Sequence, residues 1–153
     1  MANKLHLITV GKLKGHLKDF EDNFYKRLTR PLLYVHETKA FSEHPDQEAK
    51  EVLKKAEEIS AHGDYHLYLL DEAGTSFNSI ELSHWLETEL TKANHLIFCI
   101  GGAYGHHESL YKNAVGTISL SPLTLTHQMA RVIFIEQYYR VQTIWKGHPY
   151  HNG

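Results

Sequence analysis

The chain has 153 residues, of which 42% are hydrophobic and 22% charged, with a net charge of −2. This length predicts a single domain spanning residues 1–153, and the composition excludes a disordered or fibrous protein. The lone Cys99 excludes both a disulfide framework and a cysteine zinc site within one chain. Residues 5–10 are too short an apolar run for a signal peptide, and no run approaches the ~18 residues that span a bilayer. We therefore expect a cytoplasmic protein with no membrane association.

Charge is distributed unevenly along this nearly neutral chain. Residues 1–30 carry seven Lys and Arg against three acids. The low net charge argues against an open, sequence-blind nucleic-acid binder. A basic face can still guide an RNA partner, or it can be an ordinary solvated helix surface, and both interpretations stay open.

Strand and helix patterns alternate along the chain. Short apolar runs predict strands at 5–10, 32–36, 65–70, 95–100 and 115–120, and three-to-four spacing predicts helices at 16–30, 46–61, 79–93, 108–114 and 126–145. Asn78 and Glu81 form a plausible capping box at the start of the third helix, and residues 71–74 are predicted to form a turn. The alternation indicates an α/β fold with a mainly parallel sheet flanked by helices.

The last predicted helix is apolar around its whole circumference. A small domain cannot hide such a helix alone, which predicts a homodimer interface along it. Arg131 and Arg140 interrupt this apolar surface. Burying an unpaired arginine is costly, so each is expected to face an acid such as Glu136 or an anionic ligand.

Two loops near the carboxyl ends of predicted strands are candidate ligand sites. Gly101–Gly105 joins a strand to a helix, where α/β folds bind ligands, although it matches neither the dinucleotide fingerprint nor the P-loop. Residues 120–125, LSPLTL, can wrap an aromatic ring such as adenine in backbone hydrogen bonds. The alternatives are a tight turn without ligand and an ordinary loop capped by Thr126.

Thirteen histidines raise the question of a metal site. No histidine pair has a cysteine partner or an HExxH pattern, so we expect no metal. The C-terminal segment His148–His151 is either a frayed tail or a functional one. In the functional case a histidine moves protons near neutrality and Tyr150 stacks on a base.

Several of these segments resemble the RlmH family of SPOUT-class methyltransferases. The resemblance rests on Ile100–Gly102 with Gly105, on SLSPLTLTHQMARVIFIEQYYR and on the terminal HPYH, and it extends over the full length. Members of that family methylate N3 of a pseudouridine in large-subunit (23S) ribosomal RNA. The resemblance implies an α/β fold with a C-terminal trefoil knot, an S-adenosylmethionine site built by the knot, and a homodimer paired through the last helices.

The resemblance also implies site residues. The cofactor contacts would be Leu70, Gly101, Leu120, Ser121, Pro122, Leu123, Thr124 and Leu125. The imide N3 must lose a proton before it attacks the methyl group, which requires a base or an oxyanion-stabilising cation. We expect His151 or His127 as the base, Arg131 and Arg140 at a phosphate or the developing oxyanion, and Tyr150 as a stacking platform.

Three alternatives follow from the same residues. The main interpretation is an S-adenosylmethionine-dependent rRNA methyltransferase that acts on ribosomal RNA, within the assembled ribosome. A second keeps the fold and cofactor but changes the target to another RNA nucleotide, for example in tRNA. A third is a non-catalytic ribosome-binding protein. The sequence leaves open the target nucleotide, whether the substrate is free RNA or the assembled ribosome, the proton acceptor and the subunit that supplies each catalytic side chain.

Overall fold

Five parallel strands form the centre of the molecule, in the order β2-β1-β4-β3-β5. The computed structural model describes residues 4–152; residues 1–3 and 153 of the predicted domain lie outside the described residues. The strands and helices are, in chain order, β1 (Lys4–Val10), α1 (His16–Tyr25), β2 (Leu33–Thr38), α2 (Pro45–Ser60), β3 (His66–Ser76), α3 (Ser79–Glu89), β4 (His95–Ile100), α4 (Glu108–Asn113), β5 (Gly116–Ser119) and α5 (His127–Lys146).

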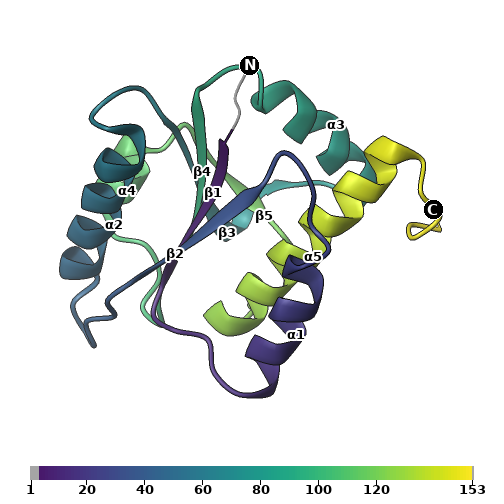
Figure 1. Ribbon diagram of the computed structural model, residues 1–153. Helices are drawn as coiled ribbons and strands as arrows, with labels where there is room; N and C mark the ends of the chain where they lie inside the picture. Colours follow the sequence, from purple (N-terminus) through teal and green to yellow (C-terminus); the bar gives the residue numbers. More distant parts are fainter. Residues whose placement is uncertain (1–3, 153) are drawn as a thin grey trace.

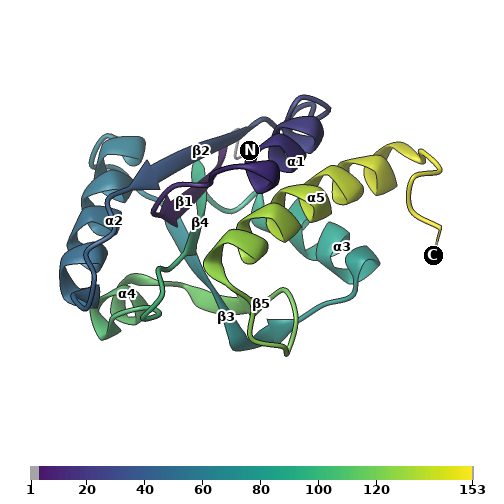
Figure 2. The same cartoon turned by 90° about the horizontal axis from the view of Figure 1, so that it is seen from below.

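Helices cover both faces of the sheet, which confirms the predicted α/β architecture. Figures 1 and 2 show α1, α3 and α5 on one face and α2 with α4 on the other. The central strand β4 supplies both layers, because Leu96 and Phe98 pack toward the first face and Ile97 and Cys99 toward the second. This double burial explains why β4 has a nearly continuous apolar sequence.

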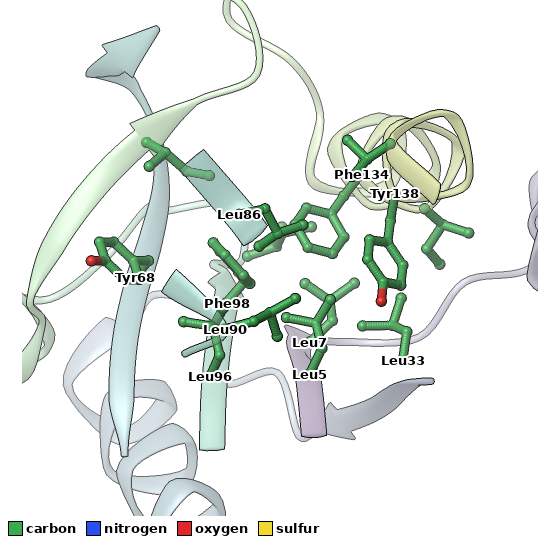
Figure 3. Packing of buried hydrophobic residues seen from close by; sticks show 14 of the residues in the cluster. Leu5, Leu7, Leu33, Tyr68, Leu86, Leu90, Leu96, Phe98, Phe134 and Tyr138 are labelled. Carbon is green, nitrogen blue, oxygen red and sulfur yellow. The ribbon is translucent and has the colours of Figure 1, made fainter. Parts of the chain in front are cut away.

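The larger core lies under α3 and α5. Phe98 is 1% exposed and stands between the rings of Tyr68 and Phe134 at centroid distances of 5.8 and 5.2 Å (Figure 3). Trp85 of α3 completes this cluster, because its ring meets Tyr68 edge-on at 5.0 Å and Phe98 at 6.1 Å. The cluster fastens α3 and α5 to the end of the sheet formed by β3, β4 and β5.

The predicted turn at residues 71–74 is wrong. β3 continues to Ser76, and a bulge between Leu70 and Thr75 shifts its register against β5. Gly74 makes this possible, because a Cβ there would come within 2.8 Å of the Ile118 backbone. Residues 71–74 are mostly polar and therefore resemble a turn in sequence. Their strand continues because Thr75 and Ser76 pair with Ile118 and Ser119 of β5.

The first helix is shorter than predicted, ending at Tyr25 instead of residue 30. Beyond it, Gln142 of α5 accepts from the Thr29 amide at 2.9 Å and donates to the Thr29 carbonyl at 2.8 Å. Gln142 is 2% exposed. The Gln142 side chain thus satisfies the backbone of Thr29 in place of helical hydrogen bonds and fixes the segment after α1 to α5.

The last helix is covered by its own chain more fully than predicted. Its residues Val132, Phe134, Ile135, Tyr138 and Val141 are buried against the sheet and the neighbouring helices. Met129 is 41% exposed, and Ile133, Tyr139, Ile144 and Trp145 are partly exposed. Homodimerisation and the trefoil knot both stay predictions. Within residues 4–152, the structure has no helix long and apolar enough to cross a membrane.

The close approach at Gly74 gives a stability prediction. Gly74→Ala should lower the free energy of unfolding by about 1–3 kcal/mol, because the added methyl group must push the paired strands apart. Gly116→Ala is the matched control in the same sheet, since a Cβ there meets only the Tyr68 ring at 3.5 Å. It should change stability by less than about 0.5 kcal/mol in urea unfolding. Equal losses in both variants would contradict this account of the bulge.

Candidate ligand site at the carboxyl ends of the strands

A cavity of about 330 Å³ opens beside the bulge of β3 and the ends of β4 and β5. It is lined by Leu70, the last residue of β3 before the bulge, by Ile100 at the end of β4 and by Leu120 directly after β5. Such edges of parallel sheets are the usual binding sites of α/β proteins, and the volume lies in the range of small-ligand pockets, ~300–1,000 Å³. The lining residues are Leu70–Glu72, Ile100–Ala103, Gly105, His106, Tyr111, Leu120, Ser121, Leu123–Leu125, His127 and Ala130.

The two loops selected from the sequence form facing parts of this cavity. Seven of the eight predicted cofactor-contact residues line it: Leu70, Gly101, Leu120, Ser121, Leu123, Thr124 and Leu125. Pro122 is exposed and is not among the lining residues. Leu123 is 70% exposed, so most of this apolar side chain is open to solvent. The geometry brings the predicted residues together but does not by itself assign them a ligand.

Two carboxylates at the bulge of β3 give the cavity a negative character. Asp71 accepts from the Tyr111 hydroxyl at 2.5 Å and from the Ala73 amide at 3.0 Å, and these bonds hold the pKa of its carboxyl below the usual value. Glu72 accepts from the Thr124 hydroxyl, which ties the bulge to the loop after β5. The lining described above contains no Lys or Arg. A cavity of this kind favours a cationic or polar neutral ligand over a phosphate.

Sequence reasoning missed several lining residues, of which His106 has the most specific contacts. Its Nε2 lies 3.0 Å from the carbonyl oxygen of Leu70, and its ring stands edge-on to Tyr111 at 6.0 Å. The available signal was its position directly after Gly105. Among thirteen histidines that position was not distinctive, and the partner carbonyl is 36 residues away.

The start of α5 also enters the cavity. Thr126 caps the helix by accepting from the Met129 amide at 3.2 Å, as its sequence position predicts. This cap sets the direction in which the first turn leaves the loop. His127 and Ala130 consequently line the cavity, and His127 is the predicted proton acceptor that lies there within its own chain.

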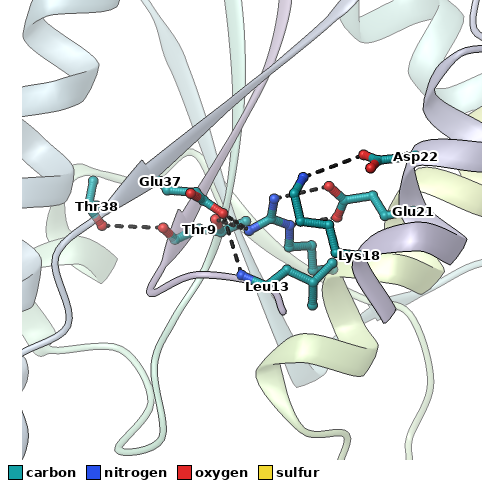
Figure 4. A network of polar contacts seen from close by, with 8 residues as sticks. Thr9, Leu13, Lys18, Glu21, Asp22, Glu37 and Thr38 are labelled. Carbon is teal, nitrogen blue, oxygen red and sulfur yellow. Dashed lines mark hydrogen bonds and ion pairs between the residues drawn. The ribbon is translucent and has the colours of Figure 1, made fainter. Parts of the chain in front are cut away.

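Arg131 lies one turn further along and faces away from the cavity, among acids. Its Nε and Nη2 donate to the two oxygens of Glu21 at 2.6 and 3.0 Å, and Nη1 donates to Glu37 at 2.6 Å and Thr9 at 3.2 Å (Figure 4). Arg131 is 5% exposed. The prediction that it faces an acid is confirmed, with Glu21 and Glu37 in place of Glu136. Its engaged donors leave no open approach for an RNA phosphate.

Arg140 pairs with Glu136, as predicted. Nη2 donates to Glu136 at 2.8 Å, and Nη1 lies 3.1 Å from Nδ1 of His151. Because a guanidinium only donates, this contact needs a neutral His151 ring that accepts at Nδ1. Tyr150 packs its ring 4.7 Å from the Arg140 guanidinium and donates its hydroxyl to Glu136 at 2.8 Å. The C-terminal segment is therefore folded onto α5 and not frayed.

These contacts place the tail away from the cavity of its own chain. α5 has 20 residues and is ~30 Å long, with His127 at its start and the tail folded against its second half (Figure 2). His151 instead lines a second cavity of about 510 Å³ between α3 and α5, together with Ile80, Leu82, Ile133 and Gln137. Among residues 4–152, no cluster of three or more His, Cys, Asp or Glu side chains suits a metal ion.

The five-stranded parallel sheet with helices on both faces defines an α/β protein, and its cavity lies where such folds commonly bind ligands. The sequence further matches the family model described as "Predicted SPOUT methyltransferase" over residues 3–151. The chain belongs to the SPOUT methyltransferase family.

Relatives at the sequence level are similar over almost their whole length. The protein named "Ribosomal RNA large subunit methyltransferase H" of Parabacteroides distasonis is 39% identical, covering 97% of this chain and 99% of the relative. The protein of the same name from Cytophaga hutchinsonii is 38% identical with the same coverage.

A solved structure shares the fold. The SpoU methyltransferase AviRb of Streptomyces viridochromogenes, solved in complex with AdoMet, superposes with a TM-score of 0.52 at 13% identity. The match covers 94% of this chain and 59% of the AviRb chain, so this protein spans little more than half of that structure.

The two arginines of α5 should differ in their effect on stability. Arg131→Met should lower the free energy of unfolding by about 3–5 kcal/mol at pH 7, because it leaves the buried Glu21 carboxylate unpaired. Arg140→Met removes a more exposed pair and should cost no more than about 1 kcal/mol. Chemical unfolding of both variants measures the difference. Similar losses would show that the Arg131 cluster is not the stronger constraint.

Proposed function

We propose that the cavity binds S-adenosylmethionine. The observation that carries this proposal is the acidic, backbone-lined cavity at the ends of β3, β4 and β5, which fits a nucleoside attached to a positively charged sulfonium. The loops at 101–105 and 120–125 offer main-chain donors and acceptors to a base and ribose. Asp71 and Glu72 offer negative charge to the cation. AviRb, which shares the fold, was solved with this cofactor.

The proposed reaction is methylation of large-subunit ribosomal RNA, with N3 of a pseudouridine as the acceptor. The names of the full-length relatives support the rRNA target, and the RlmH-like motifs support the acceptor atom. The protein would accordingly act in the cytoplasm. The proposed form of the substrate is this RNA within the assembled ribosome.

When bound, the cofactor supplies a methyl group already activated by its sulfonium. The remaining task of the protein is to hold the nucleophilic nitrogen in line with that methyl group and to accept its proton. His127 lies in the cavity lining, so its imidazole is the proposed acceptor from the same chain. His151 is the competing acceptor, with Tyr150 stacking on the target base and Arg140 beside the developing oxyanion.

In the proposed mechanism Arg131 does not touch RNA. Its donors join Glu21 of α1, Glu37 of β2 and Thr9 of β1 to α5. Arg131 therefore acts by fixing the direction of α5, which carries His127 into the cavity.

The working form is proposed to be a homodimer. The groove between α3 and α5, lined by Ile80, Leu82, Ile133 and the tail residue His151, is the apolar surface still open beside the last helix. The tail packs on Glu136 and Arg140, and its His151 lines this groove and is not among the lining residues of the cavity. A second copy seated on this groove would bring one tail toward the other chain's cavity.

Loss of the gene tests the reaction. Mass spectrometry of 23S rRNA from a deletion strain should show one pseudouridine without its methyl group, and the chain should restore the methyl group when re-expressed. Isothermal titration should show that the purified protein binds S-adenosylmethionine. Unchanged rRNA with a lost methyl group in tRNA would favour the tRNA enzyme. No cofactor binding and no missing methyl group would favour the non-catalytic ribosome-binding protein.

A mixing experiment tests the tail. His151→Ala should abolish turnover without changing cofactor affinity, and Gly101→Val should block the cavity, because a Cβ there comes 3.2 Å from the Gly105 carbonyl. If the tail acts on the partner's cavity, re-assembled mixtures should recover about a quarter of the wild-type rate, since half the dimers are mixed and each has one intact site. Asn152→Ala, the matched tail control, should retain full activity.

A mixture that stays inactive would assign the tail to its own chain. Undiminished turnover in His151→Ala alone would remove His151 from the mechanism and leave His127 as the acceptor.

A further inference from the structure

His106 joins the two sides of the cavity that belong to different strands. Its Nε2 lies 3.0 Å from the Leu70 carbonyl oxygen at the end of the regular part of β3. A carbonyl only accepts, so Nε2 carries the hydrogen and donates it. His106 itself directly follows the glycine loop that leaves β4. This hydrogen bond therefore fastens the glycine loop to the neighbouring strand.

The opposite edge of the ring is packed against backbone. A Cβ on Gly101 would come within 3.2 Å of both Cε1 and Nδ1 of His106, so only glycine admits the ring at this place. Nδ1 is buried and has no hydrogen-bond partner among the described residues. A second proton on the ring would put an unsatisfied N–H at Nδ1, which is costly in a buried site. The arrangement fits the neutral imidazole alone.

The charged and titratable groups around His106 come from three elements. Asp71 of β3 faces it, Tyr111 of α4 meets its ring edge-on and donates to Asp71, and His127 of α5 and Glu72 line the same cavity. The glycine loop itself brings no charge. Burial lowers the pKa of His106, and this outweighs the opposing effects of the Leu70 carbonyl and Asp71.

We propose that His106 is a positioning residue that fastens the glycine loop to β3 while its imidazole is neutral, and that protonation of the ring competes with cofactor binding. The inference rests on the proposed S-adenosylmethionine site. A bound sulfonium would repel a positively charged His106 in the same cavity. Binding of the cofactor and protonation of His106 therefore oppose one another. S-adenosylhomocysteine is neutral at sulfur and opposes the proton less.

The direction of the pH effect follows from these signs. Above the ordinary histidine pKa, about 6.5, the ring is neutral and the loop is fastened. As the pH falls toward the lowered pKa of His106, the protonated ring increasingly competes and the cofactor dissociates more readily. One competing proton raises the dissociation constant by up to about tenfold per pH unit.

Two substitutions separate the hydrogen bond from the titration. In His106→Gln an amide N–H can still donate to the Leu70 carbonyl, but the side chain does not titrate. In His106→Leu the donor is lost and the carbonyl is left unpaired. His62→Asn removes an exposed histidine at the end of α2, away from the cavity, and serves as the matched control.

Isothermal titration from pH 5 to pH 8 with S-adenosylmethionine and S-adenosylhomocysteine measures the effect. The wild type and His62→Asn should bind S-adenosylmethionine progressively more weakly as the pH falls from the ordinary histidine pKa, about 6.5, toward the lowered pKa of His106. Binding of S-adenosylhomocysteine should depend less on pH. His106→Gln should bind like the wild type at pH 8 and lose most of the pH dependence. His106→Leu should bind about tenfold more weakly at pH 8.

A His106→Gln variant that keeps the wild-type pH dependence would overturn the proposal, as would a His106→Leu variant that binds as tightly as the wild type. Amide hydrogen exchange of residues 101–105 in the cofactor-free protein provides an independent reading. Relative to intrinsic rates, exchange should accelerate below pH 6.5 in the wild type and not in His106→Gln. This loop measurement still decides the role of His106 if the wild type binds neither ligand, a result that would refute the proposed cofactor site.

Discussion

The site depends on the bulged pairing of β3 with β5. β3 pairs with β5 through Leu70, leaves the register for four residues, and pairs again from Thr75 because Gly74 allows the two backbones to touch. The unpaired residues of the bulge include Asp71 and Glu72, which are thereby turned into the cavity. A regular strand would point alternate side chains to opposite faces of the sheet and would separate the two carboxylates.

The walls of the cavity are held together by side chains from the neighbouring elements. Thr124 bonds to Glu72, Tyr111 to Asp71, and His106 to the Leu70 carbonyl. Each of these bonds starts on a segment that follows β4 or β5 and ends on β3. The surface offered to a ligand is therefore mostly main chain, while the side chains are used to position it. This division explains how a short chain of ordinary composition can form the proposed cofactor site.

Features of the fold that depend on residues close in sequence were predicted, and features that depend on residues far apart in sequence were missed. β4 and the α3 capping box depend on neighbours in sequence, and both were predicted correctly. The length of α1 depends on Gln142, 113 residues away from Thr29, and the strand after Leu70 depends on β5; both were missed. The same holds for the site. The glycine loop and LSPLTL are local sequence motifs and were identified, whereas His106 was missed because its hydrogen-bond partner is a carbonyl on another strand.

The two arginines of α5 show why a residue's type and helix position do not define its role. Both interrupt an apolar helix, and both pair with acids. Arg131, however, is enclosed by α1, β1 and β2, where four hydrogen bonds satisfy it and hold the start of α5 in place. Arg140 stands nine residues later, where its partners are Glu136, whose side chain is 17% exposed, and the histidine and tyrosine of the tail. A charge that is already enclosed can only fix geometry. Arg140 holds the tail, so the tail lies at the Arg140 end of the helix while the cavity lies at the Arg131 end. Nine residues, roughly 14 Å of helix, separate the two arginines, and the proposed second copy would bring the tail of one chain to the cavity of the other.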